Sequence, residues 1–226
     1  MRSTVLVTAT LLASSMGLGQ PPAPSAKASC SVTGTVAFST RDATLTPSDV
    51  VVYVAQGKRK GMSLPAATRH EIAQVKKQFT PRTLIIQRAD SVAFPNRDTP
   101  VEHSVFSSDR TTVRIKPNSK AEPEPATFTR EGGFRIQCDI HSKMRAWVMV
   151  VPDRSLATQV REDGSWRIDN VPAGAHTLKV AEPNGATVEL RVTACDSDTP
   201  VQVTLEGNEA PTLRRFNGSP YGEYQP

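Results

Sequence analysis

The chain has 226 residues, enough for one large domain or two small ones that each bury a core. Aromatic residues make up 5% of it, whereas Pro and Gly number 18 and 13, and short runs rich in Val, Ile and Thr recur between turns. This composition favours an all-β fold over a helix bundle. The net charge of +5 is spread along the chain among acidic residues. Because nucleic acid binding needs a concentrated positive face, the charge pattern argues against a nucleic acid partner.

The N-terminus has the pattern of a secretory signal. Arg2 is followed by an apolar stretch from Val5 to Leu12 and then by small residues up to Gly19. Such a segment is too short to span a bilayer and is removed on export. We therefore predict a signal peptide over residues 1–19, with Ala26–Ala28 as the second choice of cleavage site. The mature chain is expected to be exported, periplasmic or extracellular, and without a transmembrane segment.

Short strands separated by turns are predicted along the rest of the chain. The stretch from His70 to Phe79 stays open, because its apolar residues would suit one face of a helix while its flanks suit strands. The region from Pro117 to Pro125 is polar and rich in Pro, so we expect a surface connection there. The predicted strands are Ser31–Phe38, Val50–Ala55, Thr83–Ile86, Ser91–Phe94, Thr127–Thr129, Phe134–Cys138, Ala146–Val151, Trp166–Ile168, His176–Val180, Val188–Val192 and Val201–Leu205.

The pattern of strands and turns changes after Pro152. From there, short strands alternate with turns such as Asp163–Gly164 and Pro183–Gly185, which is typical of a small antiparallel β-sandwich. The last twenty residues have little apolar surface to bury, so we expect them to be mobile. The predicted organisation is a linker over 20–29, a first domain over 30–151, a second, smaller sandwich over 152–206 and a tail over 207–226.

The chain has three cysteines, Cys30, Cys138 and Cys195. In an oxidising compartment, an odd number leaves at least one cysteine outside an internal disulfide. Our hypothesis is that Cys30 pairs with Cys195, while Cys138 stays reduced as a thiolate metal ligand. The alternatives are that all three are free or that one pairs between two chains.

A possible metal site is built around one short loop. Cys138, His141 and Met144 follow one another at three-residue intervals, after a strand whose alternation delivers Cys138 to the core face. A loop this short lets three side chains converge on one point, and His103 is well placed to supply a fourth ligand from a distant loop. One thiolate, two imidazoles and one thioether are the donors of a blue-copper site. Each residue alone has an ordinary structural role, but their joint order and spacing predict a mononuclear copper site.

The segments Asn96–Phe106 and Phe134–Met144 resemble the cupredoxin family, in particular its short-loop branch similar to amicyanin and plastocyanin. The resemblance covers about residues 31–151. It implies a Greek-key β-sandwich, a type 1 copper site and one-electron transfer. The ligands that it implies are His103, Cys138, His141 and Met144.

The chain departs from the family pattern at two positions. Ser104 stands where many relatives have an Asn that braces the ligand loop, and Ser142 stands where many short-loop members have Pro. Residues beside metal ligands orient them and tune the reduction potential, so we expect effects on tuning and loop rigidity more than on metal binding. Asn96 and Ser104 are the residues expected to support the ligands without binding the metal.

The second sandwich also has a family resemblance. The segment Arg161–Val180 is similar to the carboxypeptidase regulatory-like domain, a transthyretin-like sandwich, through an Asp-Gly hairpin followed by a Val-Pro-x-Gly turn. Zinc-enzyme chemistry does not follow from that name, because the chain has no His-Glu-x-x-His motif.

The sequence therefore predicts an exported copper protein, not an enzyme, that exchanges single electrons with an unidentified protein partner. On the resemblance, His141 lies nearest the surface and is the electron port, with Lys143 and Arg145 favouring an acidic partner. The alternative is a copper-binding or structural envelope protein that uses the two sandwiches for storage, sensing or adhesion. Intense visible absorption and reversible electrochemistry discriminate between these two functions.

Overall fold

The computed structural model describes residues 29–55, 66–109, 111–116, 123–196 and 200–222. The predicted signal peptide and nearly all of the linker lie outside the described residues. Among the residues described, no helix is long and apolar enough to cross a membrane. The elements are β1 (Ser29–Ser39), η1 (Pro47–Asp49), β2 (Val51–Ala55), β3 (Arg69–Glu71), β4 (Ala73–Val75), β5 (Gln78–Thr80), β6 (Thr83–Gln87), β7 (Ser91–Ala93), β8 (Val105–Ser107), β9 (Arg114–Ile115), β10 (Ala126–Thr127), β11 (Gly132–Gln137), β12 (Arg145–Val151), η2 (Arg154–Leu156), β13 (Ala157–Gln159), β14 (Ser165–Pro172), β15 (Gly174–Ala181), β16 (Thr187–Ala194) and β17 (Val201–Glu206).

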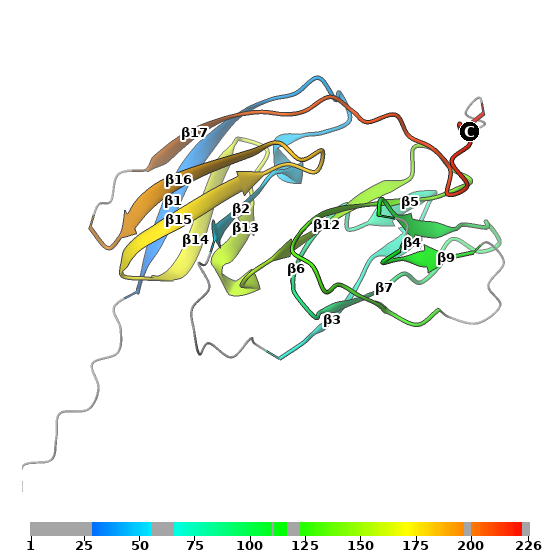
Figure 1. Ribbon diagram of the computed structural model, residues 1–226, viewed down its shortest axis with the longest axis horizontal. Coiled ribbons are helices and arrows are strands. Elements are labelled where there is room, and N and C mark those ends of the chain that lie inside the picture. The colour runs from blue at the N-terminus through cyan, green and yellow to red at the C-terminus, as the bar shows by residue number, and fades with distance from the viewer. Residues whose placement is uncertain (1–28, 56–65, 110, 117–122, 197–199, 223–226) are drawn as a thin grey trace, which may run out of the picture.

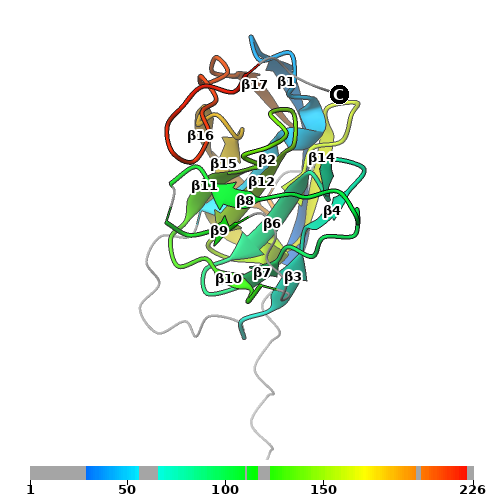
Figure 2. The ribbon, with the colours of Figure 1, turned by 90° about the vertical axis from the view of Figure 1, so that its right-hand side faces the viewer.

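The prediction of an all-β fold is confirmed, and the strands form two β-sandwiches that lie side by side (Figure 1). One of them, called here the central sandwich, contains β3 to β12. Its main sheet has the order β6-β12-β11-β8-β9, and its other strands form the sheets β10-β7-β3 and β4-β5. The other, called here the terminal sandwich, packs the sheet β14-β1-β17 against the sheet β13-β2-β15-β16. Figure 2 views the molecule from the side of the central sandwich.

The terminal sandwich contains the first two strands of the chain, which corrects the predicted domain boundaries. Strand β1 pairs with β14 and β17, and β2 pairs with β13 and β15. Residues 29–55 therefore belong with 157–206, and the central sandwich is an insertion between them. The prediction that residues 30–151 form one domain is wrong at its N-terminal end. Local alternation identified each segment as a strand, but it does not encode which sheet the strand joins.

Strand β1 occupies the centre of its sheet because one of its residues has no side chain. Its alternating residues Val32 and Val36 are buried in the terminal core together with Trp166 of β14. At Gly34, a Cβ atom would lie 2.1 Å from the Val201 carbonyl oxygen and 2.6 Å from the Trp166 ring. Glycine therefore permits the close approach that lets β1 run between β14 and β17.

The core of the central sandwich is rich in aromatic and branched residues, and it fixes the strand that leads to the predicted metal ligands. Phe134 and Ile136 of β11 are buried, and Phe134 packs edge-to-face on Phe128 with ring centroids 5.1 Å apart. This alternation continues to Cys138, which is fully buried in the same core. Every second side chain from Phe134 to Cys138 thus lies in this core, which carries the thiol inside, although Gln137 between them is buried as well.

The stretch from His70 to Phe79, left open by the sequence, forms three short strands. Strands β4 and β5 make a hairpin whose turn residues Lys76 and Lys77 have φ angles of 50° and 58°. Strand β3 pairs in parallel with β7 instead. The apolar residues that suited a helix face, such as Ile72 and Phe79, are buried in the central core.

Cys30 and Cys195 form a disulfide in the structure. The bond joins β1 to the residue that follows β16, so both partners belong to the terminal sandwich. Cys138 is the free cysteine and is buried. The pairing is the one hypothesised from the odd cysteine count.

The C-terminal tail contacts both sandwiches at some of its described residues. After β17 it crosses from the terminal to the central sandwich (Figure 1), where Arg214 and Pro220 form an isolated β-bridge. Phe216 and Tyr221 contact the central sandwich through hydrogen bonds and ring packing. The expectation that the tail is mobile stays a prediction.

Candidate metal centre

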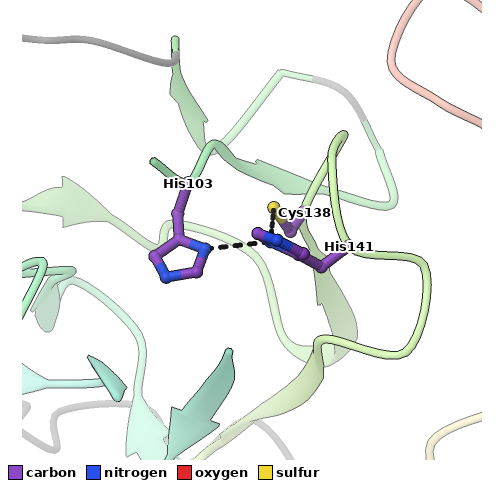
Figure 3. Close-up of side chains that lie close together, drawn as sticks. All are labelled: His103, Cys138 and His141. Atoms are coloured by element: carbon purple, nitrogen blue, oxygen red, sulfur yellow. Dashed lines mark hydrogen bonds between the residues drawn. The ribbon is translucent and has the colours of Figure 1, made fainter. Parts of the chain in front are cut away.

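Three of the four predicted ligands converge in the central sandwich (Figure 3). His103 lies just before β8, whereas Cys138 and His141 lie in the loop between β11 and β12. Strand β11 pairs with β8, so the two loops meet at the same end of the sheet. One potential ligand atom from each of the three residues lies within 4.8 Å of the others.

The donor atoms face one another at short range. The Nδ1 atoms of His103 and His141 are 3.1 Å apart, and the Cys138 Sγ atom lies 3.7 Å from His141 Nδ1. The two imidazole rings meet edge-on, with an interplanar angle of 62°. Cys138 is fully buried and His103 is 5% exposed, while His141 is half-buried. His141 is therefore the most solvent-accessible of the three.

Asp98 holds the outer nitrogen of His103. The Asp98 Oδ2 atom lies 3.0 Å from His103 Nε2 and also accepts a hydrogen bond of 2.6 Å from the backbone N–H of Lys77. The Lys77 N–H, together with the bond to His103, lowers the pKa of the Asp98 carboxyl and keeps it ionised. A carboxylate at Nε2 retains the proton there, so the Nδ1 lone pair is available for a metal.

Ser104 braces the thiol from the neighbouring loop. Its backbone N–H lies 3.5 Å from Cys138 Sγ and its hydroxyl 3.9 Å away. The same hydroxyl accepts a hydrogen bond of 2.7 Å from the Asp139 N–H. Ser104 thus links the two ligand loops and donates to the sulfur.

The environment favours the metal-binding protonation state at Cys138 and His141, but not at His103. Burial raises the pKa of the Cys138 thiol, but His103 and the backbone N–H groups of Ser104, Ile140 and His141 outweigh it and lower the pKa. Burial also lowers the pKa of His141, and the neighbouring His103 lowers it further. The pKa of His103 is raised despite burial, because the thiol and the Asp98 carboxylate favour its protonated form. Metal binding at His103 would therefore require the loss of a proton that the neighbouring thiol and carboxylate favour.

Met144 lies in the same loop as Cys138 and His141. Its backbone N–H donates to the His141 carbonyl over 3.0 Å, which closes the turn, and its side chain is 1% exposed in the core cluster that contains Cys138. Its role as a fourth ligand stays a prediction.

Asn96 contacts Asp98, the residue that is hydrogen-bonded to His103. Its side chain donates to the Val101 carbonyl and accepts from the Asp98 N–H, both over 2.9 Å. Asn96 therefore shapes the loop that presents Asp98 to His103. The expectation that Asn96 supports a ligand stays a prediction, and its route would be through Asp98.

Sequence reasoning missed Asp98 and gave Asp139 no role. The available signal for Asp98 was a carboxylate five residues before a candidate His ligand, within a loop rich in turn residues. For Asp139 no local signal existed, because its partners come from β9 and from the C-terminal tail. Asp139 Oδ2 lies 3.8 Å from Arg114 Nη1, and Oδ1 accepts from the Phe216 N–H.

The donor set fits copper. Two imidazole nitrogens and one thiolate sulfur, held in a largely buried site, match the three strong ligands of blue-copper sites. Supporting hydrogen bonds reach both His103 and Cys138, as is usual around metal ligands.

No protein-family model matches the chain, and neither does any curated protein. Among solved structures, the chain is similar to a pseudoazurin from Sinorhizobium meliltoi, at 18% identity over 38% of this chain and 76% of that one, with a TM-score of 0.31. It is also similar to a purple cupredoxin from Nitrosopumilus maritimus, at 21% identity over 36% and 98% of the two chains, with a TM-score of 0.27. A copper-containing nitrite reductase from Thermus scotoductus SA-01 has 21% identity over 43% of this chain and 25% of its own, with a TM-score of 0.29.

Proposed function

We propose that the chain is an exported copper protein that transfers single electrons through a site formed by His103, Cys138, His141 and Met144. The observation that carries this proposal is the convergence of two imidazoles and one buried thiol within 4.8 Å. When bound there, copper would supply one-electron chemistry by cycling between its two oxidation states. The protein's part is to hold the ligands in one arrangement, which favours electron transfer because little reorganisation is then needed.

The residues around the ligands support this assignment. Asp98 fixes the tautomer of His103, and Ser104 donates to the Cys138 sulfur, so the ligands are oriented before any metal binds. We propose Met144 as the weak fourth ligand, since it belongs to the same tight loop and is buried in the same core as Cys138. With four protein ligands, the site would serve electron transfer and not substrate binding.

We propose that a redox partner approaches on the side of His141. His141 is half-buried, and its neighbour Ile140 is 42% exposed. Lys143, two residues after His141, is exposed. An apolar residue beside a cation is suited to a partner with an acidic rim, whose charge would speed the encounter.

Export and the role of the terminal sandwich belong to the same proposal. The disulfide between Cys30 and Cys195 fits an oxidising compartment, in keeping with the proposed signal peptide. The terminal sandwich, which we propose to be of the carboxypeptidase regulatory-like kind, serves as a scaffold from which the central sandwich is inserted.

Copper titration of the purified chain tests the proposed function. We expect one copper per chain, with intense visible absorption from thiolate-to-copper charge transfer that disappears on reduction and returns on oxidation. Cys138→Ser should abolish the band, and His103→Ala should weaken copper binding. His176→Ala is the matched control, because His176 lies in the terminal sandwich and contacts the Pro172 carbonyl. Copper binding without the band, or a band that does not cycle, would favour the non-redox alternative.

A further inference from the structure

The end of the described chain forms a compact segment, called here the strap, over residues 214–222. The Arg214–Pro220 β-bridge closes it, and the Gly218 N–H donates to the Arg215 carbonyl over 2.9 Å. Gly218 has a φ angle of 88°, which permits the tight turn at the tip. The strap is thus a small folded unit with its own backbone hydrogen bonds.

The strap contacts the backbone of a metal ligand directly. The Tyr221 hydroxyl donates a hydrogen bond of 2.6 Å to the carbonyl oxygen of Cys138, and the Phe216 N–H donates one of 2.5 Å to Asp139 Oδ1. These two bonds hold the first two residues of the ligand loop. They come from a segment about 80 residues away in the sequence, with separations of 83 and 77.

Ring packing fixes the strap in place beside the loop. The Phe216 ring meets Phe106 of β8 edge-on, with centroids 5.8 Å apart. The Arg114 guanidinium lies over the same ring, 3.1 Å from the Phe216 ring centroid. Arg114 also lies near the Asp139 carboxylate. This residue of β9 therefore contacts both the strap and the ligand loop.

The Cys138–Asp139 peptide is therefore held on both sides. Ser104 accepts from the Asp139 N–H, while Tyr221 donates to the Cys138 carbonyl. Both polar atoms of this one peptide group are hydrogen-bonded to side chains from distant segments. Because this peptide directly follows Cys138, holding it restricts the movement of the backbone that carries the thiol.

We propose that the strap is a positioning element of the metal site, with Tyr221 as its main residue, and that it controls the opening of the ligand loop. The expected effects on copper rest on the proposed function, whereas the expected effect on the loop does not. By holding the Cys138 carbonyl, Tyr221 keeps the buried thiol aligned with the two imidazoles. The terminal sandwich thereby acts on the metal site, since the strap continues from its last strand.

The test uses Tyr221→Phe in the full chain, with Tyr53→Phe of the terminal sandwich as the matched control. In the metal-free protein, the rate at which iodoacetamide alkylates the free thiol reports Cys138 alone, because Cys30 and Cys195 form a disulfide. A fully buried thiol reacts only when the loop opens. Loss of a hydrogen bond of about 1 kcal/mol should raise the open population, and the alkylation rate, about fivefold. Tyr53→Phe should leave the rate unchanged.

A second variant, Phe216→Ala, removes the ring packing and should raise the alkylation rate as well. In the copper-loaded protein, Tyr221→Phe should shift the reduction potential and speed copper loss to a chelator, whereas Tyr53→Phe should do neither. Unchanged alkylation in both strap variants would overturn the proposal, even if copper binds normally. Faster alkylation in a protein that forms no blue-copper site would instead support the strap and refute the proposed function.

Discussion

The Asp98 carboxylate lies 3.0 Å from the His103 Nε2 atom, on the opposite edge of the ring from the Nδ1 atom that faces His141. One side chain thus determines which nitrogen of His103 can bind a metal. The same carboxylate accepts the Lys77 N–H, so the β4–β5 hairpin is tied to the loop that presents His103. The orientation of this ligand therefore depends on a hairpin that contributes no ligand of its own.

Asp98→Ala should weaken copper binding by about 10- to 100-fold, the usual cost of losing a side chain that orients a metal ligand. The reason is that His103 would lose its fixed tautomer and ring orientation. Competition with a chelator of known affinity measures the change. Asp169→Ala serves as the control, because Asp169 is exposed in the terminal sandwich and bonds Ser31 and Arg167. An affinity equal to that of the unmodified chain would show that His103 is oriented without Asp98.

Much of the site could be predicted from spacing because three candidate ligands lie within seven residues of one loop. A turn that short leaves few ways for Cys138 and His141 to avoid each other. The sequence could not predict Asp139 or Tyr221 as supporting residues, because their contact depends on the tail crossing between sandwiches. Such a contact joins segments with no shared local pattern.

The fold was predictable as a set of strands and much less so as a pairing of strands. Alternation at Val32 and Val36 identifies β1, and the same pattern would suit either sandwich. Its place is decided by contacts with distant segments of the chain. Because Gly34 has no side chain, β1 can approach the Trp166 ring and the Val201 carbonyl closely. An inserted domain is invisible to local periodicity for this reason.

Met144→Leu should leave copper bound and raise the reduction potential, if Met144 is the weak fourth ligand. A thioether stabilises the oxidised metal slightly, and the axial position tunes the potential of blue-copper sites. The exchange conserves side-chain volume, so the free energy of unfolding should fall by less than about 1.5 kcal/mol. Cyclic voltammetry measures the potential.

Met149→Leu is the matched control for this substitution. Met149 is 4% exposed on β12 and packs with Val51 and Ala181 between the two sandwiches. The same chemical change there should leave the potential where it was. Equal shifts in both variants, or none in either, would remove Met144 from the ligand set.

Replacing both Cys30 and Cys195 by Ser should lower the free energy of unfolding by about 2–5 kcal/mol, the usual effect of losing a native disulfide. The bond closes a loop with a sequence separation of 165, so it restricts a large part of the unfolded chain. Chemical denaturation under oxidising conditions measures the change. Copper stoichiometry should be unaffected, since the three converging ligands lie in the other sandwich; its loss would mean that the terminal sandwich is needed to form the site.

Asp90→Asn should destabilise the central sandwich at neutral pH by about 1–3 kcal/mol, because a buried acceptor of several hydrogen bonds is lost. Asp90 is fully buried and accepts from the Thr68 and Gln87 N–H groups, with His70 2.9 Å away. Burial raises the pKa of its carboxyl, but these bonds outweigh burial and lower the pKa in the folded state. A lowered folded-state pKa stabilises the protein above the unfolded-state value of 3.8.

This stabilisation is lost as the pH falls through the folded-state pKa, so the deficit of Asp90→Asn should shrink steadily below about pH 4. Urea denaturation at neutral and acidic pH measures both variants side by side. Asp169→Asn is the control, since its carboxylate is exposed and its hydrogen bonds to Ser31 and Arg167 are open to water. A deficit that stays constant across the acid range would show that the charge of Asp90 contributes nothing, and that packing alone explains the loss.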